Sequence, residues 1–130
     1  MYSQTTRSIM VTVQPVFLED QLSPKDHRFV WAYQVKIENR GPITVQLKRR
    51  RWRITDSMGR EQVVEGDGVV GEQPVLKPGE SFEYTSGTPL TTPSGIMVGT
   101  YFMETESGET LDVAIPAFSL DSPHQPVRLN

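Results

Sequence analysis

The sequence of 130 residues is long enough for one hydrophobic core and too short for two. Its 36% hydrophobic and 22% charged residues exclude a disordered chain, and the lack of cysteine excludes disulfides, iron–sulfur clusters and a cysteine nucleophile. The net charge of -3 does not favour phosphate backbones, so we expect no nucleic-acid partner unless a local patch provides one.

The N-terminal residues 1–7 are expected to form a tail. The N-terminus lacks the features of a signal peptide, in which a positively charged region precedes an apolar run. No stretch of the chain approaches the ~18 consecutive apolar residues that a membrane span needs. We therefore expect a cytoplasmic protein that does not insert into membranes.

Apolar residues then recur with the period of β-strands. A first strand is expected from Ile9 to Leu18, and in the next the large residues occupy every second position: Phe29, Trp31, Tyr33, Val35 and Ile37. This spacing places them on one face of a strand and predicts one wall of the core. Asn39–Pro42 then predicts a hairpin or tight corner.

The following strand changes phase. Its apolar residues occupy odd positions at Ile43, Val45 and Leu47 and even positions at Trp52 and Ile54. A change of phase inside one strand predicts a β-bulge across Lys48–Arg51.

Four further strands complete the pattern, at Gln62–Glu65, Ser81–Ser86, Ile96–Glu104 and Leu111–Ala117, with turn signals at Asp56–Gly59, Lys77–Glu80 and Glu106–Glu109. About seven strands at this spacing predict an all-β fold, a two-sheet immunoglobulin-like sandwich of the fibronectin type III kind, because the immunoglobulin cysteine pair is absent. A closed barrel is the alternative. The single domain spans 1–130, with its core at about 8–119 and a second tail at 121–130.

A glycine motif at Gly66, Gly68 and Gly71 matches G-x-G-x-x-G. In dinucleotide folds this motif opens a helix whose N-terminus holds a pyrophosphate. Here Pro74 and Pro78 follow, so no helix of useful length starts there. We expect a loop or bulged strand that needs positive φ; anion binding by the loop backbone is the alternative.

The run Lys48–Arg53 carries five positive charges and Trp52. On a strand Arg49, Arg51 and Arg53 share one face, while Lys48, Arg50 and Trp52 share the other apart from any bulge. Arg49 and Arg51 are therefore candidates to assist an anion site at the glycine motif. The alternative is that the arginines cover the sheet with their stems and pair with neighbouring carboxylates.

Catalytic and metal-ligating patterns are missing from the sequence. His27 and His124 have no partner at ligand spacing, and no nucleophile-elbow motif occurs. We expect a protein that is not an enzyme and that uses no cofactor and no metal.

Small and turn-forming residues crowd the segment Tyr84–Gly95, which predicts a long loop on a rigid scaffold. The candidate partner-binding residues are Thr88, Pro89, Leu90, Thr91 and Pro93. The nearby Met97, Tyr101 and Met103 share a strand face, which belongs either to this surface or to the core. Strand edges provide a route to a homodimer.

The same residues resemble the ApaG (CorD) family. The resemblance covers the run from Trp52 to Phe118, including GDGVVGEQPVLKPGE (Gly66–Glu80) and YTSGTPL (Tyr84–Leu90), as well as the strand WAYQVKIEN (Trp31–Asn39). It implies a fibronectin type III-like sandwich.

The resemblance implies less about function. The name CorD associates bacterial members with cobalt tolerance and magnesium efflux without a defined activity, and similar domains in an F-box protein and a polymerase-delta-interacting protein are regarded as interaction modules. The glycine motif is the family's suggested pyrophosphate site, at Gly66, Gly68 and Gly71 here. We therefore expect a non-enzymatic protein-interaction module with an unidentified protein partner; the alternative is a nucleotide or pyrophosphate binder that uses Gly66–Gly71.

Overall fold

The computed structural model describes residues 1–123, and these form nine β-strands and two short 3-10 helices. The strands are β1 (Tyr2–Thr6), β2 (Ile9–Phe17), β3 (Phe29–Asn39), β4 (Val45–Asp56), β5 (Glu61–Asp67), β6 (Val75–Leu76), β7 (Ser81–Leu90), β8 (Ser94–Thr105) and β9 (Thr110–Asp121). The 3-10 helices η1 (Glu19–Gln21) and η2 (Pro24–Asp26) connect β2 to β3.

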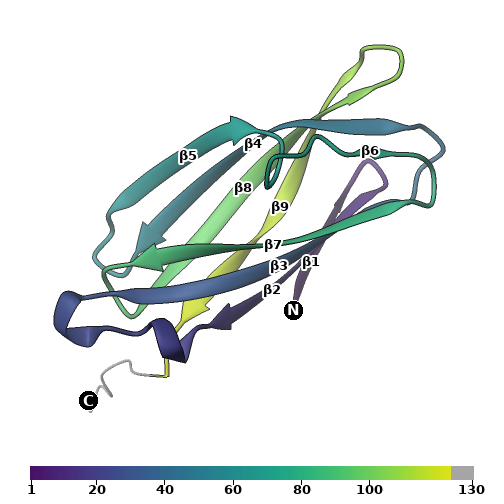
Figure 1. Cartoon of the computed structure of the whole chain (residues 1–130). Helices are drawn as coiled ribbons and strands as arrows, with labels where there is room; N and C mark the ends of the chain where they lie inside the picture. Colours follow the sequence, from purple (N-terminus) through teal and green to yellow (C-terminus); the bar gives the residue numbers. More distant parts are fainter. Residues whose placement is uncertain (124–130) are drawn as a thin grey trace.

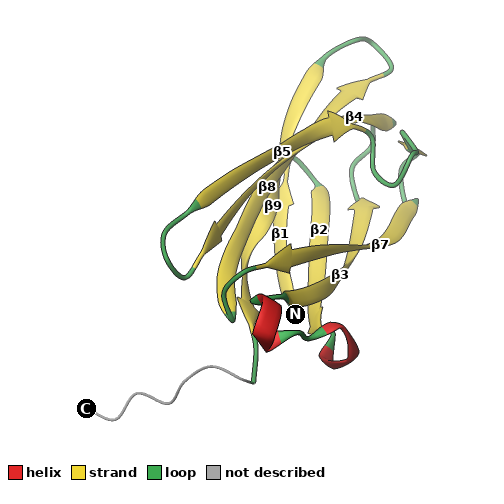
Figure 2. Cartoon of the chain, turned by 60° about the vertical axis from the view of Figure 1, so that its left-hand side comes forward, coloured by secondary structure: helices red, strands yellow, loops and turns green. Residues whose placement is uncertain are grey.

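The strands form two antiparallel sheets that face each other (Figures 1 and 2). One has the order β1-β2-β3-β7, and the other has the order β5-β4-β8-β9 with β6 also paired to β4. The predicted two-sheet sandwich is confirmed, with nine strands instead of about seven. The closed barrel is wrong, because within residues 1–123 no strand of one sheet pairs with a strand of the other.

The two sides of the sandwich differ. On one side β1 packs against β9, where the Ala114 N–H donates a hydrogen bond to Thr6 Oγ1 (3.3 Å) and the ring of Tyr2 lies 6.0 Å from that of Phe118. On the other side β7 and β5 are the outer strands of their sheets. The sandwich is thus closed along β1 and β9 and has separate edges along β7 and β5.

The inner faces of both sheets supply the core. The predicted wall is confirmed, since Phe29, Trp31, Tyr33, Val35 and Ile37 are all buried. Met97, Tyr101 and Met103 are buried too, so they belong to the core and not to a partner surface.

Polar atoms inside this core are paired. The Trp31 indole N–H donates to the Asp121 carbonyl (3.0 Å), and the hydroxyls of Tyr84 and Tyr101 hydrogen-bond to each other. Burial raises the pKa of Tyr101 well above its ordinary value, so its hydroxyl stays protonated.

The expected β-bulge is confirmed in β4. Its register with β8 shifts between Leu47 and Arg49, which leaves Lys48 as the extra residue. The shift keeps Val45 and Leu47 on the inner face before the bulge and moves Trp52 to that face after it. Ile43, expected at the start of this strand, precedes β4 and is exposed.

Three expectations about loops and tails need correction or fall outside the structure. Residues 1–7 are not a tail, because Tyr2–Thr6 form β1 and pair with β2. The long loop at 84–95 is also wrong: β7 continues to Leu90 and β8 starts at Ser94, because Ser86–Leu90 stay paired with β3. Of the tail expected at 121–130, Asp121 belongs to β9, and residues 124–130 with His124 lie outside the described residues.

Across residues 1–123, the structure has no helix long and apolar enough to cross a membrane.

Candidate functional site

The glycine motif forms a tight hairpin and not a helix start. The N–H groups of Val69 and Glu72 each donate to the carbonyl of the other residue (2.8 and 2.9 Å), which closes a two-residue turn at Val70 and Gly71. Both turn residues have positive φ, 44° and 82°, as a type I′ turn requires. The expected glycine loop with positive φ is therefore confirmed.

Gly68 is required for a second reason. Its φ is 62°, and a Cβ at this position would lie 2.1 Å from the carbonyl oxygen of Glu72. Its own N–H donates to the carbonyl of Lys48 (2.9 Å), which ties the hairpin to the bulge of β4. The N–H groups of Gly68, Val69 and Glu72 are thus used within the protein, in contrast to the free N–H groups of a phosphate-binding loop.

Arg50 is the arginine whose side chain hydrogen-bonds to the backbone of the glycine motif. Its Nη1 donates to the carbonyls of Asp67 (3.1 Å) and Gly68 (2.8 Å), and the half-buried Arg50 shares the inner side of β4 with the buried Trp52. The candidates Arg49 and Arg51 point to the other side of the strand. The structure therefore does not bring them to the inner side of the hairpin, where Arg50 lies.

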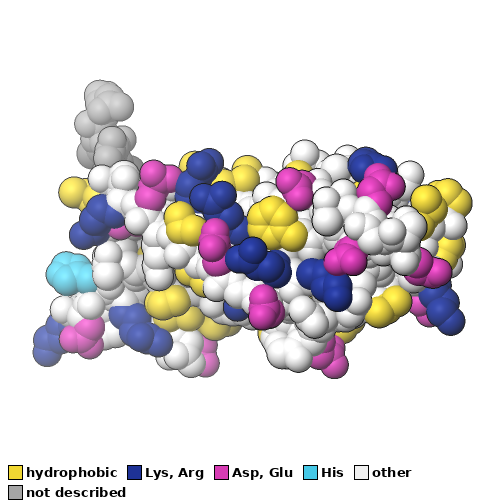
Figure 3. Space-filling model, turned by 90° about the horizontal axis from the view of Figure 1, so that it is seen from above, with side chains coloured by type: hydrophobic (Ala, Val, Ile, Leu, Met, Phe, Trp, Pro, Cys, Tyr) yellow, Lys and Arg dark blue, Asp and Glu magenta, His cyan; other side chains and the backbone are white. Residues whose placement is uncertain are grey.

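The outer arginines form a ladder with acidic residues of β5. Arg49 pairs with Glu65 (3.8 Å) and Asp67 (3.9 Å), Arg51 with Glu65 (3.3 Å), and Arg53 with Glu61 (3.4 Å). Figure 3 views this face of the sandwich from above and shows basic and acidic side chains interleaved with hydrophobic ones. The alternative interpretation, in which the arginines pair with neighbouring carboxylates, is confirmed.

A spacious groove lies at the end of the sandwich where β7 ends and β4 turns into β5. It has a volume of about 480 Å³, and we call it the end groove. The residues that line it are Asp26, His27, Arg28, Ile54, Asp56, Arg60, Glu61, Gln62, Pro89, Leu90 and Thr91. Ile54 and Leu90 are the nearly buried apolar members of this lining, and the charged members are exposed except for Asp56.

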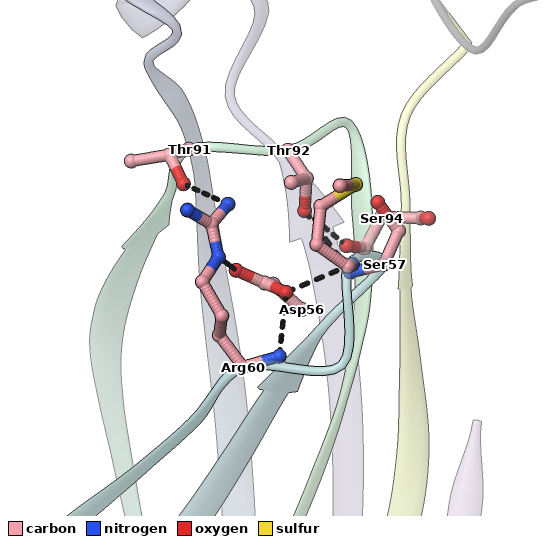
Figure 4. A network of polar contacts seen from close by, with 7 residues as sticks. Asp56, Ser57, Arg60, Thr91, Thr92 and Ser94 are labelled. Carbon is pink, nitrogen blue, oxygen red and sulfur yellow. Dashed lines mark hydrogen bonds and ion pairs between the residues drawn. The ribbon is translucent and has the colours of Figure 1, made fainter.

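The wall next to β5 is held by a polar network around Asp56 (Figure 4). Its carboxylate accepts hydrogen bonds from the Met58 and Arg60 N–H groups (2.9 and 3.0 Å) and from the Arg60 Nε (2.8 Å). Arg60 also reaches Thr91 Oγ1 (3.2 Å), and so links the β4–β5 turn to the end of β7. Desolvation tends to raise the pKa of Asp56, but these hydrogen bonds and the Arg60 charge together lower it below its ordinary value.

The opposite wall is the segment 23–28 that contains η2. Ser23 and Arg28 form a backbone bridge through two 2.9 Å hydrogen bonds, and Ser23 Oγ donates to the Asp26 carboxylate (2.7 Å). His27 caps η2 with a left-handed φ of 50°, which makes the sharp turn into β3. These contacts fix the wall that carries Arg28.

Three of the five candidate partner-binding residues line this end groove: Pro89, Leu90 and Thr91. Thr88 is buried in β7, and Pro93 lies in the short turn before β8, where its carbonyl accepts from the Ser122 N–H (3.1 Å). The sequence did not reveal Arg28 or Arg60 as companions of these residues. The turn signal at Asp56–Gly59 placed Arg60 after a turn, but gave no sign that this turn meets the end of β7.

No candidate metal site is present among residues 1–123, because no three His, Asp or Glu side chains lie close enough together to hold a metal ion.

The chain was compared with known proteins. Residues 19–105 match the family model of the ApaG domain. Proteins named ApaG from Paramagnetospirillum magneticum and Rhodospirillum centenum are 69% and 65% identical to the chain, and each alignment covers all of both sequences. A crystal structure of a protein named ApaA from Bordetella pertussis is 46% identical, with a TM-score of 0.86 over 90% of this chain and 95% of that one. The hairpin, the arginine ladder and the end groove are therefore features of a protein that belongs to the ApaG family.

Proposed function

We propose that the protein is a non-enzymatic interaction module that binds a protein partner in the end groove. The observation that carries this proposal is the composition of the groove, in which nearly buried apolar residues lie between charged walls. This arrangement resembles a small protein–protein interface, where an apolar centre excludes water and a polar rim sets orientation.

The contacts suggest what the partner presents. Of the apolar residues that line the groove, Pro89 is exposed and offers most of the surface for one inserted side chain, because Ile54 and Leu90 are only 6% and 9% exposed. Of the two arginines, Arg60 is paired with Asp56, whereas Arg28 has no carboxylate partner within residues 1–123. We infer a partner segment with an apolar side chain for the groove and a carboxylate for Arg28.

Rigid walls support the same proposal. The Asp56–Arg60–Thr91 network and the Ser23–Arg28 bridge hold both sides of the groove before any partner arrives. A preformed groove reduces the entropy lost on binding. A role in cobalt tolerance or magnesium efflux, which the family name suggests, would on this proposal act through the bound partner.

The test uses two variants and a matched control. Pro89→Arg places a long charged side chain in the groove, and Arg28→Glu reverses the charge that faces the inferred carboxylate. Ser3→Arg adds the same charge to an exposed position of β1, which is not among the groove residues. The full-length proteins are used to capture partners from native extracts, and a photo-crosslinking amino acid at Thr91 identifies those in direct contact.

We expect one or more proteins that crosslink at Thr91 and are retained by the wild type and Ser3→Arg. Both groove variants should retain them at least tenfold less, in line with the loss of a central interface contact. Equal retention by all four proteins, or no crosslink at Thr91, would contradict the proposal.

A further inference from the structure

Strand β7 is an open edge of the four-stranded sheet. It spans Ser81–Leu90 and, within residues 1–123, it pairs with β3 alone. Figure 1 shows β7 in front of the other strands of its sheet, and the strand order places it at the opposite edge of that sheet from β1. An open edge presents backbone N–H and C=O groups that another strand can bind.

The hydrogen bonds of β3 show which β7 groups face the open edge. The Val30 carbonyl accepts from Leu18 on the β2 side, whereas the Asn39 N–H donates to Glu80 on the β7 side, both at 2.9 Å. Because successive residues of a strand bond to opposite neighbours, the odd-numbered residues of β3 bond to β7. Their register partners in β7 are even-numbered. The odd-numbered residues Glu83, Thr85 and Gly87 therefore direct both backbone groups to the open edge.

This edge lacks the usual protection against pairing. Natural edge strands carry lysines, prolines or bulges, but β7 has no lysine or arginine, its register with β3 has no shift, and its one proline, Pro89, lies near its end. The outer strand of the other sheet, β5, carries three acidic side chains along seven residues. Glu83 is the only charge on β7.

We propose that β7 pairs with β7 of a second copy of this chain, antiparallel and about a two-fold axis at Thr85. In this register Thr85 opposes Thr85, and Glu83 opposes Gly87 of the second copy. Glu83, Thr85 and Gly87 then each oppose a residue with both an N–H and a carbonyl, and Ser81 opposes Pro89, which can only accept. The result is a continuous eight-stranded sheet across two sandwiches.

Two physical conditions select this register. Opposed residues of paired strands share a face, so a one-residue slip would turn the core side of one sheet toward the outer side of the other. Pro89 has no N–H to donate, and a shift in one direction that preserves the faces leaves only two outward-facing residue pairs of β7 without it, whereas the Thr85-centred register leaves three. A shift in the other direction places the two Glu83 side chains on neighbouring diagonal positions, where like charges repel. The Thr85-centred register keeps them four positions apart.

The first experiment measures the mass in solution by sedimentation equilibrium from micromolar to millimolar concentration. We expect the wild type to shift from the 14.7 kDa monomer toward twice that mass. Thr85→Pro removes an N–H that faces the open edge and none that bonds to β3, so it should fold and remain monomeric. The matched control Thr85→Val keeps the N–H and should dimerise like the wild type. A monomer at every concentration, or a dimer that Thr85→Pro leaves intact, overturns the proposal.

The second experiment tests the register with a pair of opposite charges. A Cβ at Gly87 would meet one atom within 4 Å, the Trp31 carbonyl oxygen at 3.4 Å, so both Gly87→Lys and Gly87→Glu can fold. In the proposed register each new side chain opposes Glu83 of the second copy. Gly87→Lys should strengthen the dimer and Gly87→Glu should weaken it, with a difference of roughly tenfold in the dissociation constant at low salt. Equal dissociation constants for the two variants contradict the register.

Both experiments are independent of the proposed function. Thr85 and Gly87 do not line the end groove, so partner capture and dimer formation can fail separately.

Discussion

At the scale of single residues, Val70 occupies a position that disfavours it. It is the first central residue of the type I′ turn with φ 44°, and its side chain is 57% exposed. A β-branched residue in the left-handed region costs about 1–2 kcal/mol, and exposure means that burial does not offset this cost. Asn-Gly is the preferred sequence for such a turn.

Val70→Asn should therefore stabilise the protein, by about 1 kcal/mol in urea denaturation at neutral pH. The control is Val75→Asn, at a similarly exposed valine in β6 without positive φ, which should not stabilise. If both substitutions have the same effect, strain at Val70 is not the cause.

For Arg50, the sequence predicts the side of the strand but not the hydrogen bonds of the side chain. Alternation along a strand predicted that it faces away from Arg49 and Arg51, and this is confirmed. Its hydrogen bonds to the hairpin carbonyls were not predictable, because they depend on the register that sets Arg50 opposite Gly66. A Cβ at Gly66 would lie 2.8 Å from Arg50 Nη1, so the missing side chain leaves room for the guanidinium. The glycine motif is explained here by packing as well as by turn geometry.

At the scale of elements, the turn between β4 and β5 depends on ionised Asp56. Desolvation raises the pKa of Asp56, but hydrogen bonds from the Met58 and Arg60 N–H groups and from the Arg60 side chain lower it below its ordinary value, so the folded state favours the carboxylate more than the unfolded state does. The stabilisation is then present at pH values above the unfolded pKa and is lost as the pH falls through the lower, folded pKa.

Asp56→Asn isolates this effect from the other carboxylates. We expect the wild type to be more stable than the variant between pH 5 and 7 and this difference to shrink progressively as the pH falls below about 4. Thermal unfolding of both proteins over this range measures the difference, and Asp112→Asn, on an exposed position of β9, is the control. A difference that does not change with pH would mean that Asp56 acts through its shape and not its charge.

Elements with large alternating residues were predictable, and those with small polar residues were not. The β3 wall and the bulge of β4 follow from apolar residues at fixed spacing. The second half of β7 is rich in Ser, Thr, Gly and Pro, which favour turns locally. It is a strand because β3 provides a partner for every residue from Ser81 to Leu90. This pairing depends on tertiary structure and leaves no local signal. The end groove was missed as a whole for the same reason, since its walls come from segments far apart in the chain.

At the scale of the whole molecule, the two long sides of the sandwich have different roles. The β1 and β9 side is closed by contacts between sheets, and the other side leaves β7 as an edge of ten residues. Closure on one side restricts pairing with other chains to β7 and β5. The end groove lies where β7 ends, so a dimer formed through β7 would hold two grooves in one rigid assembly.

The closed side should depend on β1, which looks like a tail in the sequence. A chain that starts at Ser8 loses five register pairs with β2 and the contact of Tyr2 with Phe118. Val11 and Val13 of β2, fully buried in the intact protein, then lie at an open edge. We expect a loss of at least ~2 kcal/mol in the free energy of unfolding, measured in urea by the fluorescence of the buried Trp31 and Trp52. Tyr2→Ala keeps the backbone pairing and should lose less than the truncation does. If the shortened chain is as stable as the full one, β1 contributes nothing and the side is closed by β2 and β9 alone.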